Sequence, residues 1–148
     1  RVVKQCQDLP GQNLFQYLDE DGTPHPVTST DVNDYIREAT GEDFTAKHFR
    51  TWGASVIFLK ELLTKKEGKR LSLKSALEPV AEALGNTPAI SRKSYVHPAL
   101  VKVLDQDPRH PLHGFVPPPP RNRLTRGESA FLAFLKKLKP KRQQGRSA

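Results

Sequence analysis

A tyrosine that follows a basic pair is the residue of this sequence best suited to chemistry. Tyr95 comes shortly after Arg92 and Lys93. A helix is predicted to begin at Thr87 and Pro88, shortly before this basic pair, because a threonine cap followed by a first-turn proline is typical of a helix start. A phenol oxygen near cations can attack a phosphodiester once its proton is lost. Taken alone, the pattern is more typical of an ordinary half-buried tyrosine.

Helices are predicted to position this tyrosine. The longest begins after Thr45, runs to about Lys65 and carries Arg50 in its second turn, where a helix favours anions. Without further information, Arg50 would be interpreted as a surface arginine paired with a carboxylate. A second helical segment covers Leu71–Leu84, and Gly85 ends it, because a helix end often needs a residue that tolerates positive φ.

Apolar spacing predicts which helix faces are buried. The long helix has an apolar stripe that we expect to be core, made of Phe49, Trp52, Val56, Leu59 and Leu63. In the tyrosine segment we expect Ala89 and Ile90 to anchor the short helix in the core.

The N-terminal part predicts one small hairpin and a helix. Leu14–Leu18 reads as a strand, Asp21-Gly22 as a turn and His25–Val27 as a short return strand. A helix then begins within Ser29–Asp31, all of them good caps. Its apolar residues fall on one face, namely Val32, Tyr35, Ile36 and Ala39. The predicted fold class is therefore mainly α, with a small β-hairpin near the N-terminus.

The charge of the chain is concentrated in its tail. The 148 residues carry a net charge of +8; residues 1–106 hold 14 basic and 14 acidic side chains, whereas residues 107–148 hold 10 and 2. Such an excess favours a polyanionic partner for the tail. The single cysteine, Cys6, excludes an internal disulfide and fits a reducing compartment. The sequence begins at Arg1 and has no methionine, which favours a fragment or an excised domain.

The C-terminal part predicts a linker and a helix. Six prolines within residues 108–120 favour an extended spacer, and residues 107–126 are interpreted as a proline-rich basic linker after a body formed by residues 1–106. Residues 127–148 are interpreted as an amphipathic helix that docks on the body, followed by a basic tail. His110 and His113 lack a third ligand nearby, so no metal site is predicted.

Three ordered segments carry a family resemblance. They are LGNTPAISRKSYVHP (Leu84–Pro98), DVNDYIREATGEDFTAKHFRTWGAS (Asp31–Ser55) and LPGQNLFQYLDEDG (Leu9–Gly22). Together they resemble bacterial type IB DNA topoisomerases over about residues 1–104. The resemblance implies the helical fold shared by topoisomerase IB and the tyrosine recombinases, with this chain as the C-terminal part of the catalytic domain.

The resemblance also implies catalytic roles. Tyr95 would be the nucleophile that forms a 3′-phosphotyrosyl bond, with Arg50 and Asn86 donating hydrogen bonds to the transition state. Many relatives have histidine where Asn86 stands, whereas bacterial members often have asparagine, which donates but transfers no proton. An upstream arginine and a lysine general acid of the family match no residue here. The chain alone is therefore expected to relax supercoiled DNA poorly or not at all.

The expected partner is double-stranded DNA, contacted by Lys47, Arg92 and Lys93. We expect a monomer that binds no membrane, needs no ATP, metal or other cofactor, and lies in the bacterial cytoplasm, at the nucleoid. No phosphate-binding loop or metal cluster is present in the sequence.

Two alternatives differ in function. A tyrosine recombinase or integrase fragment would share the fold and the nucleophile. Two features argue against this alternative. One is Lys47, because recombinases carry histidine at that position, and the other is the Leu-Gly-Asn-Thr-Pro run that ends at Pro88. A DNA- or protein-binding module that kept the fold without catalysis would need neither Tyr95 nor Arg50 for binding.

Overall fold

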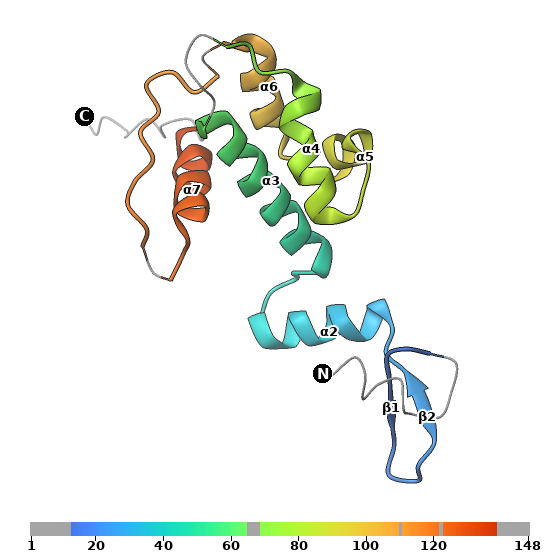
Figure 1. The fold of residues 1–148 in the computed structure, drawn as a ribbon. Coiled ribbons are helices and arrows are strands. Elements are labelled where there is room, and N and C mark those ends of the chain that lie inside the picture. Colours follow the sequence, from blue (N-terminus) through green and yellow to red (C-terminus); the bar gives the residue numbers. More distant parts are fainter. Residues whose placement is uncertain (1–12, 65–68, 110, 122, 139–148) are drawn as a thin grey trace, which may run out of the picture. The chain divides into compact units, whose positions relative to one another are not determined.

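Helices make up most of the described chain, and one small hairpin precedes them (Figure 1). The computed structural model describes residues 13–64, 69–109, 111–121 and 123–138. The predicted class, mainly α with a hairpin near the N-terminus, is confirmed. The chain divides into two compact units, one ending at His48 and the other beginning at Phe49. Among the described helices, none has both the length and the apolar character that a membrane span requires.

The hairpin of the first unit is closed by an aspartate. Strands β1 (Gln16–Leu18) and β2 (Pro24–Pro26) are antiparallel, with Tyr17 opposite His25 and stacked on it at 5.4 Å between ring centroids. The carboxylate of Asp19 accepts bonds from two backbone N–H groups of the turn and lies 2.7 Å from Nε2 of His25. The bond to His25, followed by the backbone bonds, holds the pKa of Asp19 below its ordinary value.

Helix α2 (Ser29–Thr40) begins within the predicted range, but its N-cap lies one residue before the predicted caps. Thr28 is the N-cap, because Asp31 occupies the third helical position and its carboxylate reaches back to the Thr28 N–H, which completes a capping box. No residue of α2 is buried, and Tyr35 on the predicted apolar face is 71% exposed. Within the described part of the first unit, the apolar face of α2 is therefore uncovered.

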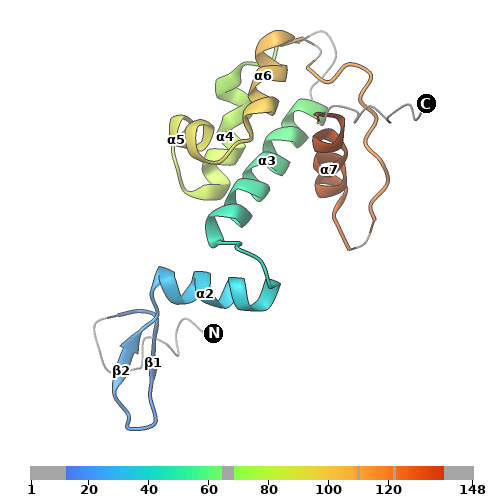
Figure 2. The ribbon, with the colours of Figure 1, turned by 180° about the vertical axis from the view of Figure 1, so that it is seen from behind.

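The second unit is organised around one long helix. Helix α3 (Ala46–Thr64) has α4 (Leu73–Leu84), α5 (Pro88–Ser94) and α6 (Pro98–Gln106) on one side and α7 (Arg126–Leu138) on the other (Figures 1 and 2). Because α7 comes last in the chain, the core of this unit joins segments that are far apart in sequence. Its buried residues from α3, α4, α6 and α7 are Ala54, Phe58, Leu59, Leu62, Ala76, Leu77, Val80, Leu100, Val101, Leu104, Ala130, Phe131 and Phe134.

The predicted core of α3 is partly wrong. Phe49 is 57% exposed, whereas Ala54, Phe58 and Leu62 are buried. Of the predicted stripe, Leu59 is fully buried, and Trp52, Val56 and Leu63 are partly buried and pack against the core. Phe49 is therefore the one stripe residue that the prediction misplaced, and the stripe omitted the residues that α3 buries on its second covered side.

The predicted anchor of α5 is also wrong. Ala89 is exposed and Ile90 is 48% exposed, so neither enters the core. Instead, Ser91 is the buried residue of this short helix, and Val96 is buried just beyond its end.

Candidate active site

Arg50 joins three segments of the second unit. From α3, its Nη2 atom donates a hydrogen bond to the carbonyl oxygen of Leu84 at 3.0 Å. Its Cζ atom lies 5.1 Å from the ring centroid of Tyr95, which is the geometry of a cation–π contact. Arg50 is exposed, and the bond to Leu84 uses only one of the five N–H donors of a guanidinium. The other donors bind no described residue, so among the described part of the chain they are available to an anion.

The turn between α4 and α5 explains why the Leu84 carbonyl can accept this bond. Gly85 adopts a left-handed conformation with φ 64°, and its N–H donates to the carbonyls of Ala81 and Glu82. The N–H of Asn86 donates to the Ala81 carbonyl at 2.9 Å, so the helix end has the paired bonds of a Schellman motif. Those bonds use the carbonyls of Ala81 and Glu82 and not that of Leu84, the last residue of α4, which accepts the side-chain bond from Arg50 instead.

Asn86 holds an unused donor. Its Nδ2 atom is buried and has no hydrogen-bond partner among the described residues. Leaving a buried amide unpaired costs on the order of 1–3 kcal/mol, and an orphaned group of this kind calls for an explanation such as a ligand. Asn86 lies two residues after Leu84, so Arg50 and Asn86 belong to the same corner of the unit. The Nδ2 atom must turn outward before it can contact an external phosphate.

Tyr95 lies just after α5 rather than inside it. The helix ends at Ser94, and Tyr95 is its C-cap, with φ −131° and its N–H bonded to the Ser91 carbonyl. The short helix that the sequence predicts from Thr87 and Pro88 therefore ends one residue before Tyr95. The side chain is half-buried, so its ring can be held while part of it reaches solvent.

Ser55 of α3 is hydrogen-bonded to the backbone of Tyr95 and His97, a contact that the sequence did not indicate. Its Oγ atom accepts the backbone N–H of His97 at 3.0 Å. It also lies 2.8 Å from the Thr51 carbonyl and 3.4 Å from the Tyr95 carbonyl, both as acceptors. Ser55 is fully buried and lies on the same helix as Arg50. One hydroxyl therefore connects the helix of Arg50 with the backbone of Tyr95.

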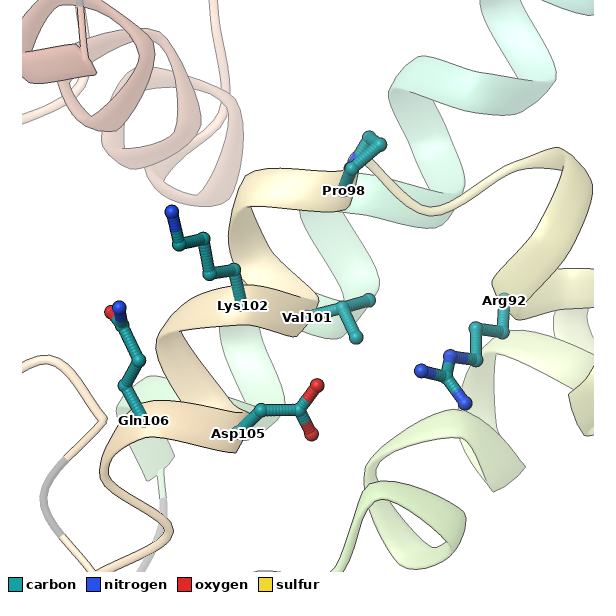
Figure 3. Close-up of a pocket in the computed structure, with 6 residues that line it drawn as sticks. All are labelled: Arg92, Pro98, Val101, Lys102, Asp105 and Gln106. Carbon is teal, nitrogen blue, oxygen red and sulfur yellow. The ribbon is translucent and has the colours of Figure 1, made fainter.

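The three predicted DNA-contacting cations are all exposed. Lys47 lies in the first turn of α3, and Arg92 and Lys93 lie in the last turn of α5. Arg92 borders an open pocket of about 420 Å³, across which Figure 3 shows its guanidinium facing Asp105 of α6. The other residues that line this pocket are Pro98, Val101, Lys102 and Gln106.

Metal ligands do not gather in the part of the chain that the structure describes. No group of three or more His, Cys, Asp or Glu side chains in it could hold a metal ion. His110 of the predicted His-x-x-His pair, and the basic tail from residue 139, lie outside the described residues.

Sequence comparison identifies the family. Residues 1–108 match the family described as eukaryotic DNA topoisomerase I, catalytic core. The chain belongs to this topoisomerase I family. It is also 36% identical over 118 residues to DNA topoisomerase 1B of Acanthamoeba polyphaga mimivirus, a match that covers 72% of this chain and 35% of the viral protein. The chain thus spans about a third of the length of that relative.

The topoisomerase I match contains all three predicted catalytic residues, because Arg50, Asn86 and Tyr95 lie within residues 1–108. It stops before α7 (Arg126–Leu138), which nevertheless contributes to the core of the second unit. The coarser part of the predicted resemblance, to topoisomerases of type IB, agrees with the comparisons. Bacterial origin and placement at the C-terminal end of a catalytic domain stay predictions.

Proposed function

We propose that this chain is the tyrosine-bearing part of a type IB DNA topoisomerase, which cuts one strand of double-stranded DNA, allows it to rotate and reseals it. The observation that carries the proposal is the position of the Arg50 guanidinium, 5.1 Å from the ring centroid of Tyr95. A guanidinium beside a phenol can hold a phosphate against the nucleophile. Both residues belong to the part of the chain that matches the topoisomerase I family.

In the proposed cleavage step, the Oη atom of Tyr95 forms a bond to phosphorus as the bond from phosphorus to the 5′ oxygen breaks. Arg50 donates two hydrogen bonds to the non-bridging oxygens, where negative charge gathers, and Asn86 donates one from Nδ2 after it turns outward. The phenol loses its proton during the attack, and the leaving 5′ oxygen gains one. The product is a 3′-phosphotyrosyl ester, which conserves the bond energy for religation.

The proton for the 5′ oxygen has no assigned source in this chain. The resemblance places a lysine acid and another arginine upstream of Arg1, so we propose that the chain alone relaxes DNA poorly and acts as the C-terminal part of a longer catalytic domain. Lys47, Arg92 and Lys93 would contact DNA phosphates, which predicts salt-sensitive binding. We further propose a monomeric bacterial enzyme of the nucleoid that uses neither ATP nor metal.

A covalent-capture experiment tests this function. The chain, joined to the upstream part of its protein, is mixed with a nicked DNA duplex whose cleaved end dissociates, in a buffer without divalent metal. The wild type should form a protein–DNA adduct that survives denaturant, and Tyr95→Phe should form none while its DNA affinity is unchanged. Tyr17→Phe is the matched control, because it removes an exposed phenol from the hairpin. Plasmid relaxation then separates a topoisomerase from a recombinase. A folded wild type that binds DNA and never forms the adduct would refute the proposal.

A further inference from the structure

Helix α7 (Arg126–Leu138) approaches α3 (Ala46–Thr64) too closely to be an independent tail. A Cβ atom placed on Gly127 would lie 2.9 Å from Cγ1 of Val56, so only glycine fits at this point of contact without displacement. Ala130, Phe131 and Phe134 of α7 are at most 5% exposed. Figure 2 shows α7 beside α3, on the side that α4 to α6 leave free. The helix is therefore part of the core, although the family match ends at residue 108.

Glu128 couples the start of α7 to Trp52. One carboxylate oxygen, Oε2, accepts the Thr125 backbone N–H at 2.8 Å, and the Glu128 N–H donates to Oγ1 of Thr125, which together form a capping box. The other oxygen, Oε1, accepts the indole Nε1–H of Trp52 at 3.3 Å. Trp52 lies two residues after Arg50, so the capped end of α7 touches the helix turn that carries this arginine.

Phe131 touches both elements that hold the candidate site. Its ring lies 5.0 Å from the ring of Trp52 and 6.1 Å from the ring of His97, measured between centroids. His97 comes two residues after Tyr95, and its backbone N–H is bonded to Ser55 of α3. One buried phenylalanine thus stands between the turn of Arg50 and the turn of Tyr95.

We propose that α7 is a positioning element of the active site, in which Phe131 and Glu128 fix the Arg50 guanidinium against the Tyr95 ring. The inference rests on the proposed function, because the reaction gives that geometry its purpose. Both side chains are assigned an indirect role, because the contacts that link them to the site are with Trp52 and His97. They act through Trp52 and His97, and a displacement of about 1 Å at a reacting group can lower a rate by about a hundredfold.

The test compares two buried phenylalanines of α7 in the full-length protein. Phe131→Leu removes the ring between Trp52 and His97, whereas Phe134→Leu removes a ring that packs edge-on against Phe115, at 6.3 Å between centroids. Single-turnover adduct formation is measured at saturating DNA, well below the melting temperature of either variant, together with DNA affinity. The ring chemical shifts of isotope-labelled Tyr95 are recorded as a readout that does not depend on cleavage.

Phe131→Leu should slow adduct formation by about tenfold to a hundredfold, leave DNA affinity unchanged and shift the Tyr95 ring signals. Phe134→Leu should lower the melting temperature by a similar amount but leave both readouts at wild-type values. Glu128→Ala, which removes the acceptor of the Trp52 indole N–H, should slow adduct formation and shift the Tyr95 ring signals in the same direction as Phe131→Leu. Equal behaviour of the two phenylalanine variants would overturn the positioning role. If the wild type forms no adduct, the proposed function fails, and the Tyr95 signals still decide whether α7 positions this residue.

Discussion

Replacing Ser55 with alanine should weaken the unit and the candidate site together. The Ser55 hydroxyl accepts the His97 N–H at 3.0 Å and lies within hydrogen-bond distance of the Thr51 and Tyr95 carbonyls. Alanine removes this acceptor, so the His97 N–H is left without it beside a side chain that is fully buried. The backbone that follows Tyr95 then loses its bond to the helix of Arg50.

The size of the effect follows from the lost bond. A donor left without its partner on burial costs about 1–3 kcal/mol of the free energy of unfolding. For a unit of about 100 residues, each kcal/mol lowers the melting temperature by about 4–8 °C. The rate of adduct formation should fall as well, because the position of the Tyr95 backbone is no longer fixed.

Ser91→Ala is the matched control for this measurement. Ser91 is as buried as Ser55, but its Oγ atom has no partner among the described residues. Removing it should leave the melting temperature equal or higher, because an unpaired buried hydroxyl stabilises nothing. Thermal unfolding and single-turnover cleavage are compared for the two variants. If Ser55→Ala melts and cleaves like Ser91→Ala, the reasoning that ties Ser55 to Tyr95 is wrong.

Two further predictions concern α7 (Arg126–Leu138). Gly127→Ala should lower the free energy of unfolding by about 1–3 kcal/mol through the contact with Val56. Adding Val56→Ala to the same chain should restore part of the lost stability. Thermal unfolding of the single and double variants checks this prediction, and a single variant as stable as the wild type would contradict it. The bonds from Thr125, and then from Trp52, hold the pKa of Glu128 below its ordinary value. The stability that Glu128 contributes is therefore present above the ordinary glutamate pKa and lost as pH falls through the lowered one. Denaturant unfolding across acid pH should show a smaller decline in Glu128→Gln than in the wild type, and parallel curves would argue against the assignment.

Local signals in the sequence predicted the helix ends well. Thr87 caps α5, Pro88 is its first residue, and Gly85 ends α4 in the left-handed conformation, as expected. These features depend on bonds between residues three to five positions apart, so nearby sequence determines them. The N-cap of α2 was predicted one residue too late because several neighbouring residues are suitable caps. The bonds between Thr28 and the Asp31 carboxylate place the cap at Thr28.

Long-range packing was harder to predict. The exposed Phe49 and Ile90 show that an apolar residue at helical spacing does not reveal whether another segment covers it. The expectation that Arg50 and Tyr95 act in one site came from a family resemblance, since no periodicity relates residues of two different segments. The sequence predicted that residues 127–138 dock on the body, but not that Phe131 would reach His97.

The place of α7 in the chain has a consequence for folding during synthesis. Trp52 and Glu128 are 76 residues apart, yet they are hydrogen-bonded in the finished unit. While the ribosome extends the chain, α3, α4, α5 and α6 can associate early, but the Trp52 and Val56 side of α3 stays uncovered until α7 has been made. A nascent chain that pauses in the run of prolines at 117–120 would therefore present an apolar strip to solvent.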